Sequence, residues 1–365
     1  MRILWMLAVL FAGCATAQQP EDFLDEISLP DGFKIEIFAS DIENARSLEQ
    51  GIDGIIFVGN RGGGKVYALV DENQDGKSDK TYVLAEGLNQ PNGVAFKDGD
   101  LYIGEISRIS VMRDIAESLE NPPRMKTIRD DFPTESHHGA KHIAFGPDGK
   151  LYVPIGAPCN ICLKKDERFA SIMRMNPDGS DLELFASGVR NTVGLDWHPE
   201  TNELWFTDNG RDWLGDNKPN DELNCAPKKG MHFGYPFCHN GDLSDPKFGD
   251  QRDCKEFEPP VQKLLPHIAP LGLTFLENDG FPEEYRTSIL IAEHGSWNRT
   301  TPIGYRISRV ELEGNKAVKY EAFADGWLKG SKRLGRPVDV LELKDGSILV
   351  SDDHANCIYR ITYSK

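Results

Sequence analysis

The sequence lacks any apolar run long enough to cross a membrane as a helix. The run from Ile3 to Ala12 spans ten residues, whereas a spanning helix needs about 20. Helical periodicity is also scarce, and the best short candidate for a helix is 114–119. We therefore expect neither a transmembrane segment nor a mainly helical fold.

Basic residues are few compared with acidic ones. Lys and Arg number 41 against 58 Asp and Glu, which leaves a formal net charge of −17. An acidic surface repels phosphate backbones and anionic lipid headgroups. This balance argues against nucleic acid as a partner and against a peripheral seat on an anionic membrane.

The cysteine pattern lacks the features of two common metal sites. No His follows Cys162, so the pair Cys159 and Cys162 is not a c-type haem attachment site, and no second CxxC completes a four-Cys zinc site. Three interpretations of the pair remain open: a redox motif, a zinc half-site or a short-range disulfide. Apart from Cys14 the cysteines number six, and an even number in an exported chain suggests disulfides. Cys238 and Cys254 flank a loop rich in Asp, Gly and Pro and are the first predicted pair.

The N-terminus indicates export. Arg2, the short apolar run and the small residues after it are typical of a signal peptide, with an A-x-A cleavage site at Ala15 to Ala17. The expected signal peptide is 1–17. An alternative is a lipoprotein box that ends at Cys14, which would carry a lipid anchor. We expect a periplasmic or secreted protein, or alternatively an outer-membrane lipoprotein.

One short phrase recurs along the chain. It consists of a hydrophobic residue, a turn such as Asp-Gly, and an alternating strand, and the turn residues tolerate the backbone of tight hairpins. Equivalent points lie 45, 50, 53, 85 and 59 residues apart, a spacing typical of β-propellers. These points are Phe57, Tyr102, Tyr152, Trp205, Leu290 and Leu349.

The repeats predict an all-β, six-bladed β-propeller over residues 22–365, with an insertion at about 212–266. We expect Phe33 to Phe38 to pair with Ile358 to Thr362, because closing the ring removes exposed sheet edges. The aromatic residues of the repeats are expected in the core between blades rather than on ligand platforms; they are Phe96, Phe145, Trp197 and Trp205.

The acidic stretch from Asp71 to Asp79 resembles a calcium-binding loop. Its pattern is D-x-N-x-D-G-x-x-D, which places oxygen side chains on a tight turn, but position 12 is Tyr82 instead of Glu. We predict a structural calcium site there, the alternative being an acidic turn that binds nothing. The expected ligands are Asp71, Asn73, Asp75 and Asp79.

A histidine cluster precedes the third repeat. His137, His138 and His142 lie within six residues, a pattern open to a metal cluster, a general base or coincidence. Strict alternation would place His138, Ala140 and His142 on one face.

Cationic and amide residues recur at equivalent positions before and after the blade strands. On a propeller such positions converge on one face around the axis, and several Arg beside carboxylates and His suit an acidic cofactor with a divalent ion. Taken singly, each Arg is more often part of a surface ion pair. The segments are Ser187–Gly194, Thr207–Asp212, Asn220–Asn224, Glu293–Arg299 and Gly335–Pro337.

Together these motifs resemble the PQQ-dependent soluble sugar dehydrogenases, a family that includes glucose, aldose-sugar and sorbosone dehydrogenase-like enzymes. The ordered set begins with His-x-Gly-x-x-His-Ile-x-Phe-Gly-Pro-Asp-Gly at His138 and continues through Gly-x-Arg-Asn and Glu-His-Gly-Ser-Trp-Asn-Arg. The resemblance spans about residue 28 to the C-terminus and is nearest to the sorbosone dehydrogenase-like branch.

The resemblance implies a site with PQQ near the axis and Ca2+ as a Lewis acid. His138 would be the general base, Arg190 would stabilise negative charge on the quinone oxygen, and a hydride would pass from the substrate to PQQ. The backbone carbonyls of Gly210 and Arg211 would hold the catalytic calcium. The remaining cofactor contacts would be Asn191, Asn209, His294, Arg299 and Arg336.

Several positions depart from the family pattern. His137 replaces an acidic residue, Ala157 replaces an Asp, and Val338 replaces the second Arg of a cofactor clamp. A sugar-contacting Gln has no clear match, although Asn89 and Gln90 lie near. These departures argue against glucose as the substrate.

The expected function is oxidation of a sugar or related alcohol, with electrons leaving to an external acceptor because the chain has no haem motif. One alternative is a calcium-dependent lactonase on the same fold, in which side-chain Glu, Asn and Asp hold the metal. Another is a non-catalytic propeller that binds carbohydrate or protein.

Overall fold

The computed structural model describes residues 20–364. The predicted signal peptide and the candidate lipid anchor at Cys14 lie outside these residues. Between residues 20 and 364 no helix is long and apolar enough to cross a membrane.

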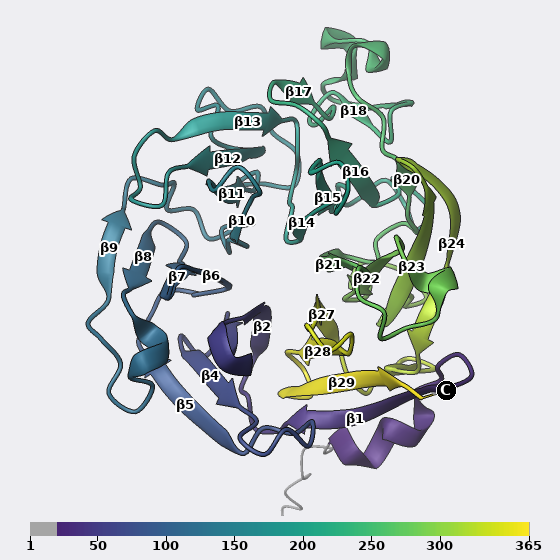
Figure 1. Ribbon diagram of the computed structural model, residues 1–365. Helices are drawn as coiled ribbons and strands as arrows, with labels where there is room; N and C mark the ends of the chain where they lie inside the picture. Colours follow the sequence, from purple (N-terminus) through teal and green to yellow (C-terminus); the bar gives the residue numbers. More distant parts are fainter. Residues whose placement is uncertain (1–19, 365) are drawn as a thin grey trace, which may run out of the picture.

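Six sheets, each with four antiparallel blade strands, stand around a central axis like the blades of a propeller (Figure 1). The third sheet also has a parallel fifth strand, in which Met231–His232 pairs with Ala186–Ser187. The prediction of an all-β, six-bladed propeller is confirmed. The first three blades are β2–β5 (Ala45–Gln50, Ile56–Asn60, Val66–Val70, Lys80–Ala85), β6–β9 (Gly93–Lys97, Asp100–Gly104, Ile109–Met112, Lys126–Arg129) and β10–β13 (Ala144–Phe145, Leu151–Ile155, Ser171–Met175, Glu183–Ser187).

The other three blades complete the ring and take in the chain termini. They are β14–β15–β16–β20 (Leu195–Trp197, Leu204–Asp208, Glu222–Ala226, Gln262–Lys263), β21–β24 (Pro270–Phe275, Ile289–Glu293, Arg306–Glu313, Lys316–Asp325) and β27–β28–β29–β1 (Pro337–Glu342, Ile348–Asp352, Cys357–Tyr363, Phe33–Ala39).

The recurring phrase corresponds to the first hairpin of each blade. All six equivalent residues found in the sequence lie in the second strand of a blade, that is in β3, β7, β11, β15, β22 and β28. In the β6–β7 hairpin, Asp98 and Gly99 have φ of 52° and 91°, the left-handed backbone that a tight two-residue turn requires. The Asp98-Gly99 turn therefore sets the register of this hairpin.

Aromatic rings join neighbouring blades, as the sequence predicted. A ring from the second strand of one blade packs on a ring from the first strand of the next. The centroid distances are 5.5 Å for Phe57–Phe96, 4.9 Å for Tyr102–Phe145, 5.1 Å for Tyr152–Trp197 and 5.8 Å for Trp205–Phe275. These rings form the core between blades and leave function to the loops.

The N-terminal strand closes the ring. β1 is the outermost strand of the last blade and pairs antiparallel with β29, from Phe33 opposite Tyr363 to Ala39 opposite Ile358 (Figure 1). This pairing was predicted. Phe33 also packs edge-on against Phe281, Tyr285 and Phe323 of the fifth blade.

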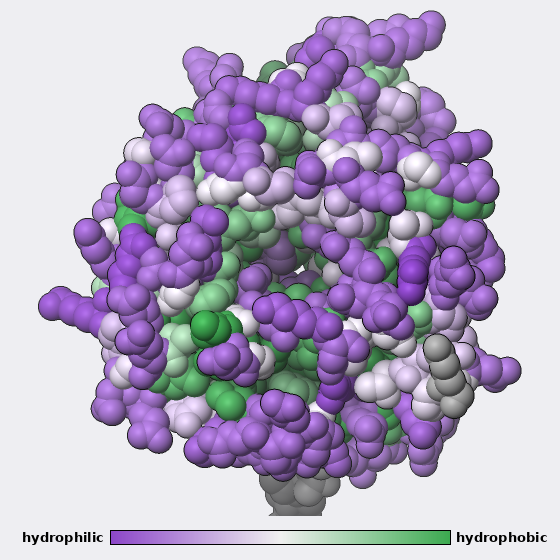
Figure 2. Space-filling model, viewed as in Figure 1, coloured by the Kyte–Doolittle hydropathy of each residue, from purple (hydrophilic) through white to green (hydrophobic). Residues whose placement is uncertain are grey.

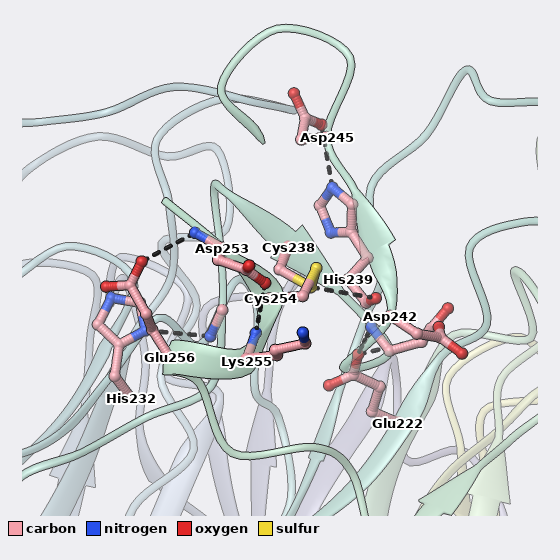
Figure 3. Close-up of a disulfide and its surroundings, with 12 residues drawn as sticks. Glu222, His232, Cys238, His239, Asp242, Asp245, Asp253, Cys254, Lys255 and Glu256 are labelled. Carbon is pink, nitrogen blue, oxygen red and sulfur yellow. Dashed lines mark hydrogen bonds and ion pairs between the residues drawn. A yellow bond between two sulfur atoms is a disulfide. The ribbon is translucent and has the colours of Figure 1, made fainter. Parts of the chain in front are cut away.

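Part of the predicted insertion belongs to the fourth blade. β16 and β20 fall within 212–266 and are the third and fourth strands of the fourth blade, so the added segment is 227–261. It contains β17 (Met231–His232), β18 (Cys238–His239), β19 (Leu243–Ser244), η4 (Gly249–Gln251) and η5 (Cys254–Glu256). The predicted disulfide between Cys238 and Cys254 is present and fastens this segment to itself (Figure 3).

Helical structure within residues 20–364 is limited to short 3-10 segments, of which the longest has seven residues. The candidate helix at 114–119 is only η3 (Ile115–Glu117), because the backbone of Ser118 leaves helical geometry at φ −151°. The other short elements are η1 (Pro20–Glu26), η2 (Ile52–Gly54), η6 (Glu283–Tyr285), β25 (Leu328–Lys329) and β26 (Lys332–Arg333).

Candidate functional site

A cavity of about 420 Å³ lies where the loops of several blades meet, and the ring is visibly hollow at its centre (Figure 2). Its volume is within the range usual for small-molecule sites. Most of the predicted site residues line this cavity: His138, Arg190, Asn191, Asn209, Gly210, His294 and Arg336. Segments separated by nearly 200 residues are thus brought to one place.

His138 has a defined orientation and tautomer. Its Nδ1 lies 2.8 Å from the carbonyl oxygen of Ala157. Since a carbonyl only accepts, Nδ1 carries the hydrogen, and in a neutral ring Nε2 is left with a free lone pair. Ala157, which stands where the family pattern has an Asp, thus orients His138 through its backbone carbonyl.

Burial keeps the imidazole of His138 neutral. Burial, then the charge of Arg190, then His137, lower the pKa of His138 to about 2. Gly156 makes this seat possible, because a Cβ there would lie 2.5 Å from the Cβ of His138. A neutral, oriented imidazole is the form in which His acts as a general base.

Arg190 is buried, and its guanidinium donates four hydrogen bonds. Nε donates to the carbonyl of Asn160 at 2.9 Å and Nη1 to that of Asn209 at 3.0 Å. Nη2 donates to Oδ1 of Asn160 at 3.0 Å and pairs with Asp212 at 3.2 Å. Of the five guanidinium hydrogens, one on Nη1 has no partner among residues 20–364.

The loop that holds Arg190 is the CxxC segment. Cys159 and Cys162 form a disulfide, so the short-range disulfide is the correct reading of this motif. Asn160 lies between them and also accepts from the backbone N–H of Asp212 at 2.8 Å. The disulfide loop therefore orients Arg190, a role that the motif alone did not reveal.

Asn191 and Asn209 are tied to each other and to the backbone around them. Asp208 accepts the N–H groups of Arg190 and Asn191 at 2.8 and 2.6 Å. The side-chain amide of Asn209 donates to the carbonyls of Asn191 and Pro270 at 3.0 and 2.9 Å. This network fixes the segment in front of the cavity.

The two predicted carbonyl ligands of calcium lie on a braced turn. The N–H of Gly210 donates to Asp221 at 2.7 Å, and Asp221 also accepts from the N–H of Ala269 at 2.9 Å. The side chain of Arg211 extends away from the cavity to Asp245 of the inserted segment, at 2.6 Å. Asp245 accepts from His239 as well, at 3.0 Å (Figure 3).

Asp353 joins two arginines and a histidine from three blades. It binds Arg46 at 2.8 Å, Arg336 at 2.7 Å and His294 at 3.1 Å. Burial alone would raise the pKa of Asp353, but His294 and the two arginines lower it below the usual range. This carboxylate stays ionised and positions His294 and Arg336 at the cavity.

Arg299 does not line the cavity. Its guanidinium donates to the carbonyl of Asp216 and, at 3.4 Å, to that of Thr301. It ties two loops together, so its position favours a structural role over the cofactor contact that the motif suggested.

The replacement of an Arg by Val338 changes the bottom of the site. Val338 is buried and packs with Val193 and Leu271, which both line the cavity. These three residues come from three neighbouring blades and form a small apolar cluster beside the cavity. The positive charge is carried instead by side chains around the walls.

Several residues of the site were missed by the sequence reasoning. Arg46, Arg61 and Arg333 all border the cavity, and Asp353 joins the network behind it. The Asp-Asp pair that follows the last repeat strand was a usable signal for Asp353. The arginines had none, because each belongs to a segment without a recognisable motif.

The face predicted for His138, Ala140 and His142 is wrong for His142. The segment is not a strand, and His142 is buried, with Nδ1 2.8 Å from the hydroxyl of Ser47. Of the three residues, His138 and Ala140 line the cavity and His142 does not.

The acidic loop lies between β4 and β5, outside the cavity. The carboxylate of Asp71 accepts from the N–H of Gly76 at 2.8 Å, and that of Asp79 from the N–H of Glu72 at 2.8 Å. Asn73 and Asp75 contact each other at 3.2 Å. Within 20–364 no group of three or more His, Cys, Asp or Glu is arranged to hold a metal ion. Calcium binding by this loop stays a prediction.

The fold and the axial cavity place the chain among six-bladed propellers with a ligand-sized cavity on the ring axis. The chain belongs to the TrAA12-like family, whose model matches residues 27–362.

The chain is similar to other proteins over nearly its whole length. A protein of Borreliella burgdorferi is 34% identical over 378 residues, which cover 99% of this chain and 97% of that protein. The PQQ domain of pyranose dehydrogenase from Coprinopsis cinerea, in its holo form, superposes with a TM-score of 0.81 at 18% identity, over 96% of this chain and 99% of that one. The Trichoderma reesei enzyme of family AA12 superposes with a TM-score of 0.79 at 19% identity, over 93% of this chain and 98% of that one.

These comparisons confirm the resemblance to PQQ-dependent sugar dehydrogenases. The assignment to the sorbosone dehydrogenase-like branch stays a prediction.

Proposed function

We propose that this protein is a PQQ-dependent dehydrogenase that oxidises a hydroxyl group of a sugar or related alcohol. The observation that carries the proposal is the pairing, in one cavity, of a neutral, oriented histidine with a cationic wall. His138 supplies the base, and the wall consists of Arg46, Arg61, Arg190, Arg333 and Arg336.

The donor set fits the cofactor. PQQ is a tricarboxylate, and the arginines gather positive charge at one place in a chain whose net charge is −17. Arg61 and Arg333 are exposed, so their guanidinium groups can meet carboxylates at the cavity mouth. When bound, PQQ supplies the acceptor for the hydride that leaves the substrate carbon.

The residues of the chain supply the proton chemistry and the charge. Nε2 of His138 accepts the proton of the substrate hydroxyl as the carbon is oxidised to a carbonyl. The free hydrogen on Nη1 of Arg190 is available for the oxygen on which negative charge develops.

The turn at Gly210 and Arg211 fits a calcium ion. No donor among the described residues hydrogen-bonds to the carbonyl oxygen of Gly210 or of Arg211. The turn itself is held in place, because the carbonyl of Asn209 accepts from Arg190 and Asp221 accepts from the N–H of Gly210. Oxygen ligands of this kind are those that Ca2+ prefers.

The lactonase alternative requires axial carboxylates that are free to bind metal. Asp208 and Asp221 are buried, and each already accepts two backbone N–H groups. The arrangement therefore favours the dehydrogenase, with electrons passing to an external acceptor.

The test is a titration of the purified protein with PQQ and CaCl2, followed by absorbance, with dye reduction measured over a panel of sugars and alcohols. We expect saturable PQQ binding, and turnover that falls by about 10²–10⁴ in His138→Gln while PQQ still binds. His354→Ala is the matched control, because His354 is exposed and outside the cavity. Failure of a folded, calcium-loaded protein to bind PQQ would refute the proposal.

A further inference from the structure

Two tryptophans at the rim of the cavity are exposed. Trp213 and Trp297 have exposed fractions of 69% and 67%, and Trp297 lines the cavity. Their rings pack edge to face, with centroids 5.6 Å apart and planes 85° apart. Large aromatic side chains normally bury most of their surface. This Trp213–Trp297 pair presents two perpendicular apolar surfaces to solvent.

The pair belongs to loops of neighbouring blades that are fastened to each other. Trp213 follows β15 and Trp297 follows β22. Nδ2 of Asn298 donates to Asp212 at 2.6 Å, and the N–H of Thr300 donates to Asp216 at 3.1 Å. Arg299 adds its bond to the carbonyl of Asp216. The two rings are thus held in place by a polar scaffold instead of by a hydrophobic core.

The backbone of Trp213 is strained. Its φ is 71°, in the left-handed region that bulky residues rarely adopt. The strain is not offset by burial of the ring, because most of the ring is in solvent. Strained residues of this kind gather at ligand-binding sites.

We propose that the Trp213–Trp297 pair is a subsite for a second pyranose ring, next to the ring whose hydroxyl is oxidised. This inference rests on the proposed function and names the substrate class as oligosaccharides or glycosides. A pyranose has C–H faces that suit the negative face of an aromatic ring, and hydroxyl edges that suit polar neighbours. Such neighbours are present in Asp216, Asn217 and Asn298.

The size of the pair favours a sugar over a protein partner. A specific protein interface buries about 800 Å² on each side, far more than two ring faces offer. The pair is also continuous with a cavity of small-molecule size through Trp297. A substrate that reaches from the cavity onto the rim would contact both.

The test compares the binding of carbohydrates that have one pyranose ring with the binding of those that have two. The calcium-loaded full chain is titrated calorimetrically, with and without PQQ, with glucose, methyl glucoside, maltose and cellobiose. We expect at least one disaccharide to bind about tenfold more tightly than its monosaccharide, the gain from one added aromatic contact. Trp297→Ala should abolish this difference and leave monosaccharide affinity within about twofold, whereas Trp297→Phe should retain most of it. In turnover, KM for the disaccharide should rise while kcat holds.

Val318→Ala is the matched control, since Val318 is also exposed but lies on the outer strand β24. Equal affinity for monosaccharides and disaccharides would overturn the subsite. An equal loss of affinity for both classes in Trp297→Ala would overturn it as well. If Trp297→Ala binds every carbohydrate like the parent protein and loses only the rate of reduction of a protein electron acceptor, the pair is a docking surface and the subsite is wrong. Because these titrations need no turnover, a preference for disaccharides without PQQ binding would refute the proposed function and support the subsite.

Discussion

At the scale of single residues, burial decides the charge of the histidines around the axis. Burial lowers the pKa of His138 to about 2 and those of His142 and His294 to about 4. A His whose pKa is lower in the folded than in the unfolded state binds more protons when unfolded, so stability falls as the pH falls below the unfolded pKa of about 6.5. Each of these side chains is therefore a source of acid sensitivity.

His142 offers the clearest measurement of this effect, because it touches no carboxylate and lies outside the cavity. Burial first, and then the charge of Arg46, lower its pKa. We expect the free energy of unfolding of the native protein, relative to His142→Asn, to fall by about 2 kcal/mol between pH 7 and pH 5. Asn keeps an acceptor for the hydroxyl of Ser47 and does not titrate. Urea denaturation of both proteins at the two pH values checks this, and parallel pH profiles would contradict it.

The sequence predicted the site residues that lie in contiguous motifs. His138, Arg190 and Asn191 stood out because each lies beside a repeat strand and among other polar residues. Arg46 and Asp353 did not, since their contact joins positions 307 residues apart and depends on the closure of the ring. Orientation was equally hidden, as shown by Arg299, whose motif fits a cofactor contact but whose side chain ties two loops.

At the scale of elements, the inserted segment 227–261 supports the site from outside the blade. Asn240 of this segment donates its N–H to Glu222 at 2.8 Å, and Asp245 holds Arg211. The segment has little regular structure, so its own stability depends on the Cys238–Cys254 disulfide and on the small aromatic cluster around Phe237 and Phe257. The sequence predicted this disulfide from loop composition but did not separate β16 and β20 from the insertion, because short strands in a Pro- and Gly-rich stretch carry no periodicity.

Removal of that disulfide should loosen the inserted segment locally. Closing a loop of this length stabilises it by about 3 kcal/mol, so in the Cys238→Ser, Cys254→Ser double variant we expect faster amide hydrogen exchange between residues 238 and 254. Exchange in the blade strands should stay as in the native protein. Cys225→Ser, which removes an unpaired cysteine, is the control. Unchanged exchange across the loop would show that its other contacts suffice.

At the scale of the whole molecule, the ring depends on one seam. β1 adds the outermost strand to the last blade, and Phe33 fills the space between that blade and the fifth one. Phe33 is buried and meets four aromatic rings: Phe281, Tyr285, Phe323 and Tyr363. The seam was predictable because a closed propeller must pair its termini, whereas the packing of Phe33 against the fifth blade was not.

Phe33→Ala should therefore destabilise the entire propeller. We expect a loss of about 3–5 kcal/mol in the free energy of unfolding, the usual cost of a large cavity in an aromatic core. Equilibrium denaturation followed by tryptophan fluorescence measures it, with Val318→Ala as an exposed reference expected to change stability by less than about 0.5 kcal/mol. A loss below about 1 kcal/mol would mean that the ring holds without this side chain.

The pairing of β1 with β29 also sets the order of events during synthesis. The strand from Phe33 to Ala39 is made among the first and has no partner until the strand from Cys357 to Tyr363 has been made. The first five blades can assemble as the chain grows, but the last one waits for β29. A chain interrupted before residue 357 leaves β1 unpaired, so synthesis of β29 is the step that permits closure and, with it, the meeting of Arg46, His294 and Arg336 on Asp353.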